Sequence, residues 1–237
     1  MIYLRSLSFY IIYLLSGLLA GLAGCLIGPF LNISNRIKFL SAWPRFANWA
    51  LYKSCKIEVV IEGSENIPNG PFVIASNHQG QWETFFYQYF FFPMTTLLKR
   101  ELLFIPVWGW ALALLRPIAI NRGNPTVALK TALREGEKRI KKGFSVLNFP
   151  EGTRKDPGEI GRYARSGFEL AKKMQVPILP IVHNSGDCWP AHRFLKFPGK
   201  ITLTIGAPVE GIESSAEAAK KMEDWARKKL ELIKLND

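Results

Sequence analysis

A long uncharged segment near the start of the chain places the strongest constraint on how it folds. Residues 6–35 contain no Asp, Glu, Lys or Arg and consist mostly of Leu, Ile, Phe, Tyr, Ala and Gly. A bilayer is crossed by about 20 apolar residues, so this segment is long enough to span one. A buried core helix that is apolar on all sides would need a larger protein around it. We therefore expect a membrane anchor here.

A cleaved lipoprotein signal is the main alternative for this segment. Residues 22–25 read Leu-Ala-Gly-Cys, which has the form of a lipoprotein cleavage box with Cys25 as the lipidated residue. However, Arg5 alone supplies the basic start, and the chain after Cys25 stays apolar, beginning with Leu26, instead of opening into a polar linker. A retained anchor fits better. Its glycines and Pro29 leave open whether it crosses the membrane or folds back as a shallow hairpin.

Basic and aromatic residues are interleaved in the segment that follows the anchor. They are Arg36, Lys38, Phe39, Trp43, Arg45, Phe46, Trp49 and Lys53. This composition is typical of an interfacial helix that lies at the level of the lipid headgroups. We therefore predict that residues 1–55 form a membrane anchor with an interfacial helix. The positive charges also favour a cytoplasmic position for the rest of the protein.

The net charge limits the partners without choosing among them. At +12, the chain would attract nucleic acid, anionic lipid or an anionic substrate. Neither a nucleic-acid motif nor a strand platform of aromatic residues is present in the sequence, so we expect no nucleic-acid partner. The cysteines Cys25, Cys55 and Cys188 have no metal-ligand spacing and are odd in number. A reduced protein with no metal and no cofactor is expected.

After residue 56, short β-rich runs alternate with helical patterns, as in an α/β domain. Strands are predicted at residues 57–62, 72–76, 118–121, 145–149, 178–182 and 201–205. Helices are predicted after an N-cap at Asn124, at residues 163–174, and after the capping box from Ser214 to Glu217. The fold class expected is a mixed sheet flanked by helices, preceded by the apolar anchoring helix or hairpin.

The most informative stretch comes directly after one of these strands. Residues 75–84 read Ala-Ser-Asn-His-Gln-Gly-Gln-Trp-Glu-Thr. On one continuous helix His78 and Glu83 would point about 140° apart, so they meet only if His78 precedes the helix and Glu83 lies in its first turn. The carboxylate would then hold one imidazole nitrogen and leave the other free to accept a proton from an alcohol. Taken alone, this spacing is more often a structural turn in which Glu83 favours the helix dipole.

A second candidate region follows the strand predicted at residues 145–149. Residues 150–154 read Pro-Glu-Gly-Thr-Arg, and they offer backbone N–H groups, a hydroxyl and a guanidinium that suit a phosphate; the same loop could also be a simple turn. Lys99 and Arg122 could each be an ordinary solvent-exposed charge in a loop. Because open α/β folds bind ligands above one edge of the sheet, cations that follow several strand ends can converge there.

Four stretches in this order resemble the motifs of the glycerolipid acyltransferase family. They are residues 78–83, 99–122, 149–154 and 176–182. The combination is specific although no single motif is, and the resemblance covers roughly residues 57–208, with the closest likeness to bacterial 1-acylglycerol-3-phosphate acyltransferases. The family usually has Asp where this chain has Glu83. A subgroup of the bacterial enzymes is similar to this sequence in having Trp-Glu-Thr there.

The resemblance implies a direct acyl transfer. His78, oriented by Glu83, would take the proton from the free sn-2 hydroxyl of 1-acyl-sn-glycerol-3-phosphate (lysophosphatidic acid), and that oxygen would attack the thioester of acyl-CoA or acyl-carrier protein to give phosphatidic acid. The substrate-binding residues implied are Lys99, Arg122, Glu151, Gly152, Thr153 and Arg154, with Glu151 bracing the loop. Residues 56–237 would form the acyltransferase catalytic domain. It would face the cytoplasm from the cell inner membrane and contact an anionic membrane surface.

Two other classes of function remain open from the sequence. The same motifs would serve an acyltransferase for another lysolipid, such as a lyso-ornithine lipid or lysophosphatidylglycerol. A non-catalytic basic membrane-binding protein, including a degenerate member of the family, would explain the net charge without any chemistry. The presence of His78, Glu83 and Arg154 favours the enzyme.

Overall fold

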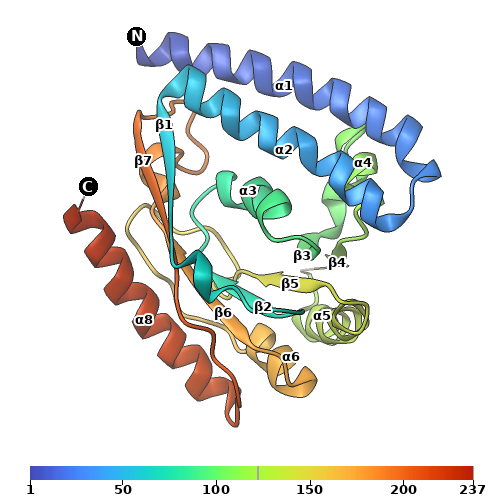
Figure 1. Cartoon of the computed structure of the whole chain (residues 1–237), viewed down its shortest axis with the longest axis vertical. Helices are drawn as coiled ribbons and strands as arrows, with labels where there is room; N and C mark the ends of the chain where they lie inside the picture. The colour runs from blue at the N-terminus through green and yellow to red at the C-terminus, as the bar shows by residue number, and fades with distance from the viewer. Residues whose placement is uncertain (122, 237) are drawn as a thin grey trace.

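A seven-stranded mixed sheet forms the centre of the protein (Figure 1). The structure is a computed structural model that describes residues 1–121 and 123–236. Its strands are β1 Ile57–Glu62, β2 Val73–Ser76, β3 Met94–Lys99, β4 Ile118–Ile120, β5 Ser145–Asn148, β6 Ile178–His183 and β7 Gly199–Ile205, in the order β1-β7-β6-β2-β5-β3-β4. β6, β2, β5, β3 and β4 are mutually parallel, whereas β7 is antiparallel to β6 and β1 is parallel to β7. The expected mixed α/β fold is confirmed.

The sheet is covered on both faces, because side chains alternate along each strand. On one face, residues such as Ile74 and Leu147 pack against α1, α2 and α3. On the other, Val73 and Val146 pack against α5, α6 and α8. The helices are α1 Ile2–Ile27, α2 Ile33–Cys55, α3 Trp82–Phe90, α4 Trp108–Leu114, α5 Pro125–Ile140, α6 Ser166–Met174, α7 Ser185–Cys188 and α8 Ser215–Asn236. Short 3-10 turns lie at Gly28–Phe30, Ser64–Asn66 and Arg100–Phe104.

Most predicted elements agree with the structure, with two differences. The six predicted strands are present within two residues at each end, but β3 was not predicted; its Met-Thr-Thr-Leu-Leu-Lys sequence lacks the β-branched apolar run that marks the others. α6 begins at Ser166 rather than at residue 163. The reason is tertiary, since the backbone N–H of Tyr163 donates to the carboxylate of Glu223 on α8. The predicted caps at Asn124 and Ser214 do accept backbone N–H groups, at 3.1 Å and 3.3 Å.

The first two helices form a hairpin that folds back at the turn Gly28–Phe30, and they run side by side across the top of the molecule (Figure 1). α1 packs closely on its neighbours through glycines spaced four residues apart. A Cβ at Gly17 or at Gly21 would lie under 3 Å from Trp108 or Val107, respectively. By length and composition, Ile2–Phe30 could also cross a bilayer. The outer face of α1 exposes large apolar side chains, including Leu15 at 59% and Leu19 at 67%.

Candidate active site

The turn from β2 to α3 lies at the middle of the sheet, at the carboxyl ends of its parallel strands. Asn77 fixes the start of this turn, because its Nδ2 donates to the carbonyl of His183 and its Oδ1 accepts the N–H of the same residue, at 2.9 Å and 3.1 Å. α3 then begins at Trp82, so Glu83 lies in the first turn of the helix and His78 precedes it. This is the geometry that their spacing in the sequence requires if the two side chains are to meet.

His78 and Glu83 form a hydrogen-bonded pair, with 2.8 Å between Nδ1 and Oε1. The same Oε1 accepts the backbone N–H groups of Gln79 and Gly80, at 2.8 Å and 2.7 Å. Glu83 is fully buried, and burial by itself would raise the pKa of its carboxyl. The hydrogen bond from His78 and the electrostatic interactions with the rings of His183 and His78 outweigh this and hold the pKa well below its usual value. Glu83 is therefore a carboxylate acceptor.

This arrangement sets the tautomer of His78. Because the carboxylate accepts at Nδ1, the proton of the neutral imidazole lies on Nδ1 and the lone pair lies on Nε2. No described residue forms a hydrogen bond with Nε2, and the side chain is 14% exposed. The ring stacks on Phe149, with 4.1 Å between the ring centroids, which fixes its plane. The pair is thus arranged as a general base with Nε2 as its free nitrogen.

We call the turn from β2 to α3, residues 77–83, the catalytic turn. Glu151 joins this turn to the loop after β5. Its Oε2 accepts the backbone N–H of His78, and its Oε1 accepts that of Gly161, each at 2.8 Å. The N–H of Lys155 in turn donates to the carbonyl of His78 at 2.8 Å. Burial raises the pKa of Glu151, although both backbone donors oppose that shift. The side chain therefore acts on the protein backbone in this structure, as a brace between two loops.

The other predicted binding residues lie at the same edge of the sheet. We call Lys99, Gly152, Thr153 and Arg154 the rim. Lys99 ends β3, and the other three follow β5, which lies between β2 and β3. Lys99, Gly152 and Thr153 are exposed and Arg154 is half-buried. The side chains of Lys99, Thr153 and Arg154 have no hydrogen bond or ion pair with any other described residue, so their donors are available to an anion. Arg122 lies outside the described residues.

Two buried residues near the pair were not predicted as part of the site. Ser185, at the start of α7, donates from its hydroxyl to Glu83 Oε2 at 3.0 Å. His183, at the end of β6, is fully buried, and burial lowers its pKa. Neither residue belongs to a local motif with His78, because each lies more than a hundred residues along the chain from it.

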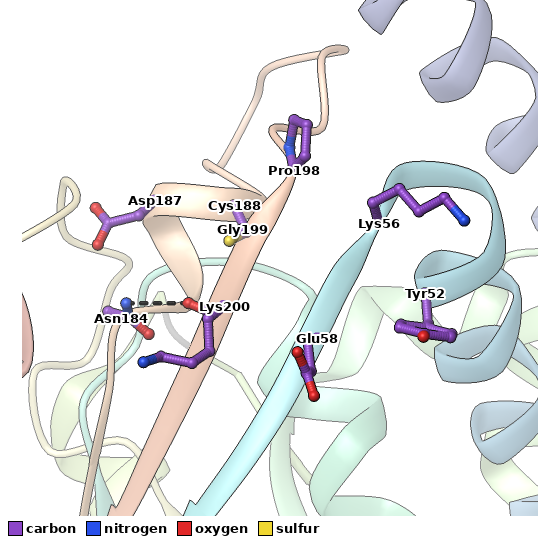
Figure 2. Close-up of a pocket in the computed structure, with 9 residues that line it drawn as sticks. All are labelled: Tyr52, Lys56, Glu58, Asn184, Asp187, Cys188, Pro198, Gly199 and Lys200. Atoms are coloured by element: carbon purple, nitrogen blue, oxygen red, sulfur yellow. Dashed lines mark hydrogen bonds between the residues drawn. The ribbon is translucent and has the colours of Figure 1, made fainter.

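A cavity lies beside α7 rather than over His78 (Figure 2). It has a volume of about 600 Å³ and opens between the end of α2, the start of β1 and β7, and α7. Side chains of both signs of charge line it, namely Lys56, Lys200, Glu58 and Asp187 (Figure 2). None of the predicted site residues contributes to it. Within residues 1–121 and 123–236, no group of three His, Cys, Asp or Glu side chains could hold a metal ion.

Comparison of the whole chain with known proteins identifies its family. Residues 58–184, more than half of the chain, match the family described as Acyltransferase. The chain belongs to this family. A 1-acyl-sn-glycerol-3-phosphate acyltransferase of Pseudomonas aeruginosa is 43% identical to it over 227 residues, which is 94% of this chain and 88% of the relative.

More distant acyltransferases share the same core. The yeast (Saccharomyces cerevisiae) 1-acyl-sn-glycerol-3-phosphate acyltransferase is 30% identical over 186 residues, 73% of this chain and 60% of its own length. The crystal structure of the 1-acyl-sn-glycerophosphate (LPA) acyltransferase PlsC from Thermotoga maritima superposes with a TM-score of 0.81 at 28% identity. It covers 98% of this chain and 95% of that one. The similarity therefore includes the N-terminal hairpin as well as the sheet.

Proposed function

We propose that this acyltransferase transfers an acyl group from acyl-CoA or acyl-carrier protein to the sn-2 hydroxyl of 1-acyl-sn-glycerol-3-phosphate, producing phosphatidic acid. The observation that carries the proposal is the 2.8 Å contact between His78 Nδ1 and Glu83 Oε1, which leaves Nε2 free at the edge of the sheet. The names of the similar enzymes from Pseudomonas aeruginosa and yeast support this acceptor.

In the proposed reaction, His78 acts as base and then as acid. Its Nε2 takes the proton of the sn-2 hydroxyl as that oxygen attacks the thioester carbonyl, which forms a C–O bond and a tetrahedral oxyanion. Collapse of this intermediate breaks the C–S bond, and the leaving thiolate takes the proton from the imidazolium. Glu83 remains ionised and stabilises the imidazolium between these steps. The products are the ester and a free thiol, and His78 is returned to its neutral form.

The rim would bind the phosphate of the acceptor. A guanidinium and an ammonium provide charge-assisted donors, and the backbone of Thr153 adds an N–H group. The N–H of Gly152 instead donates to the carbonyl of Phe149 at 3.0 Å, so Gly152 shapes the loop. Gly152 has φ of +70°, a left-handed conformation that favours glycine. We include Arg122 in this set from its position in the sequence, after β4. Binding at the rim would convert an encounter of two substrates into an oriented one.

We further propose that the N-terminal hairpin, residues 1–55, holds the catalytic domain, residues 56–237, on the cytoplasmic face of the inner membrane. The exposed apolar side chains of α1 and of the outer face of α2 support this, since such surfaces are rarely left in water. Replacing Leu15 and Leu19 together by Glu should reduce co-sedimentation with anionic vesicles. The matched control is the same change at Leu232 and Leu235, exposed on α8. Equal binding by both variants would contradict this orientation.

The experiment that tests the reaction measures thiol release from acyl-CoA by the protein in detergent, with and without lysophosphatidic acid. We expect release only with the acceptor, formation of phosphatidic acid, and a loss of about 1,000-fold in His78→Ala, the scale of general-base catalysis. His192→Asn is the control, because His192 is exposed at φ +60°, a conformation that Asn tolerates. Turnover that survives in His78→Ala would disprove the mechanism. Turnover with a lyso-ornithine lipid or lysophosphatidylglycerol, but not with lysophosphatidic acid, would show that the acceptor is that other lysolipid.

A further inference from the structure

The two oxygens of the Glu83 carboxylate have very different surroundings. Oε1 accepts from the His78 ring and from the backbone N–H groups of Gln79 and Gly80, all within 2.8 Å. Oε2 accepts from the hydroxyl of Ser185 at 3.0 Å, and no other described residue donates to it. Because Glu83 is fully buried, water does not replace a missing donor there. Ser185 therefore holds the Oε2 side of the carboxylate, while three other donors hold Oε1.

Ser185 is itself held from several directions. Its backbone N–H donates to Nδ1 of the His183 ring at 3.3 Å, and its carbonyl accepts the N–H of Trp189 at 2.8 Å. The next N–H along α7, that of Gly186, donates to the side chain of Gln79 at 3.0 Å. α7 is thus tied directly to the catalytic turn. The Ser185 hydroxyl is a fixed donor rather than a mobile surface group.

His183 links the two ends of this arrangement. Burial lowers the pKa of its ring, so the ring remains neutral, and Nδ1 accepts from Ser185. The ring proton therefore lies on Nε2, which donates to the carbonyl of Asn77 at 3.1 Å. Asn77 directly precedes His78 in the chain. One buried imidazole thus connects the residue before the base to the serine that holds the carboxylate.

We propose that Ser185 is a positioning residue for acyl transfer, which holds Glu83 so that Oε1 stays directed at His78 during the proton transfers. This inference rests on the roles proposed above for His78 and Glu83. Ser185 does not reach His78 itself and acts through the carboxylate alone. The side chain of Asp is one methylene shorter, so at position 83 it could not contact both the backbone N–H groups of the turn and Ser185 from the same helix position.

The test is a double-mutant cycle between Ser185→Ala and Glu83→Asp, with kcat, both KM values and the thermal midpoint measured for each variant. We expect Ser185→Ala to lower kcat about tenfold, the scale of one hydrogen bond to a buried charge, with both KM values unchanged. In the Glu83→Asp background the same change should cost less than about twofold, because the contact is already absent. Ser145→Ala is the control, since Ser145 is also buried but lies at the amino end of β5, where it accepts the N–H of Phe72.

A Ser185→Cys variant has the same shape with a slightly larger atom and a weaker donor, so its kcat should fall between those of the wild type and Ser185→Ala. An equal loss in the Glu83 and Asp backgrounds would overturn the proposal and make Ser185 merely structural. The proposal would also be overturned if Ser185→Ala kept the kcat of the wild type while Glu83→Ala was inactive. That outcome would leave the proposed role of the His78–Glu83 pair unchanged. If Glu83→Ala itself retains full kcat, the proposed function of the pair fails, whatever Ser185 does.

Discussion

The catalytic turn and the rim occupy the same edge of the sheet but are built in opposite ways. At the turn, Glu83 has no exposure, and both of its oxygens are hydrogen-bonded within the protein. At the rim, Lys99 and Arg154 reach no partner among the described residues. A buried pair that is already satisfied needs no rearrangement when charge develops on the imidazole. Exposed cations without a partner in the protein, in contrast, can form their ion pairs and hydrogen bonds with a ligand. From this comparison we predict that the turn controls kcat and that the rim controls KM.

The largest effect predicted for the turn is that of Glu83→Gln. The amide carries no charge to stabilise the imidazolium, and its NH2 group cannot accept from the backbone donors. We expect kcat to fall about 100-fold or more, with both KM values within a few-fold of wild type. Steady-state kinetics in detergent would measure this, with Glu231→Gln on the exposed face of α8 as the control. A rise in KM alone would contradict the division between turn and rim.

Glu151 offers a way to break the comparison, because it touches both regions. In Glu151→Ala the backbone N–H groups of His78 and Gly161 lose their buried acceptor, and the loop that carries Arg154 is released from the turn. We expect kcat/KM to fall about 30-fold, which corresponds to a loss of about 2 kcal/mol of transition-state stabilisation. Both kcat and KM should change. An effect on KM alone would mean that Glu151 serves only the rim.

Arg154 tests the rim by itself. Removing one charge-assisted contact to a phosphate in Arg154→Ala should raise KM for lysophosphatidic acid about tenfold, and kcat should change little. Arg154→Lys should restore part of the loss, because a point charge replaces the planar fork. Arg134→Ala is the matched control, since Arg134 is 68% exposed on α5. A large fall in kcat in Arg154→Ala would show that this residue acts in the transition state as well.

The smallest predicted effect concerns Lys196, a cation that is buried, unlike the cations of the rim. Lys196 is fully buried; its Nζ donates to the carbonyls of Arg193 and Phe194, at 2.9 Å and 3.0 Å, and lies over the rings of Tyr10 and Trp189. Burial lowers its pKa from 10.5 to about 8. Between these values the unfolded chain binds a proton that the folded protein does not, so folding stability contributed by this group rises with pH.

The thermal midpoint of the wild type should therefore rise relative to that of Lys196→Met between pH 7.5 and pH 9.5, a range chosen to bracket a pKa of about 8. Burial raises the pKa values of the neighbouring Cys55 and Tyr10, that of Cys55 to about 11, so neither ionises in this range. Activity should change little, because Lys196 contacts neither the turn nor the rim. A constant difference between the two midpoints across this range would contradict the lowered pKa.

Much of this architecture was determined by the sequence itself. Strands such as residues 178–182 are continuous apolar runs because both faces of the sheet are covered, and the run alone marks them. The N-cap side chains of Asn124 and Ser214 each accept the backbone N–H of the residue three positions later. Such local hydrogen bonds can be predicted from the sequence without any tertiary contact. The pairing of His78 with Glu83 was also accessible, since a spacing of five residues permits contact only across a turn that enters a helix.

Only the tertiary structure decided the rest, because those contacts join residues that are far apart in the chain. Ser185 meets Glu83 across 102 positions, and Glu151 meets His78 across 73, only because β6 and β5 flank β2 in the sheet. Likewise, whether the apolar N-terminal segment folds back was not visible in its composition. It depends on the close approach of α4 to the glycine face of α1. Local patterns specify elements, but strand order and helix packing select which of their side chains meet.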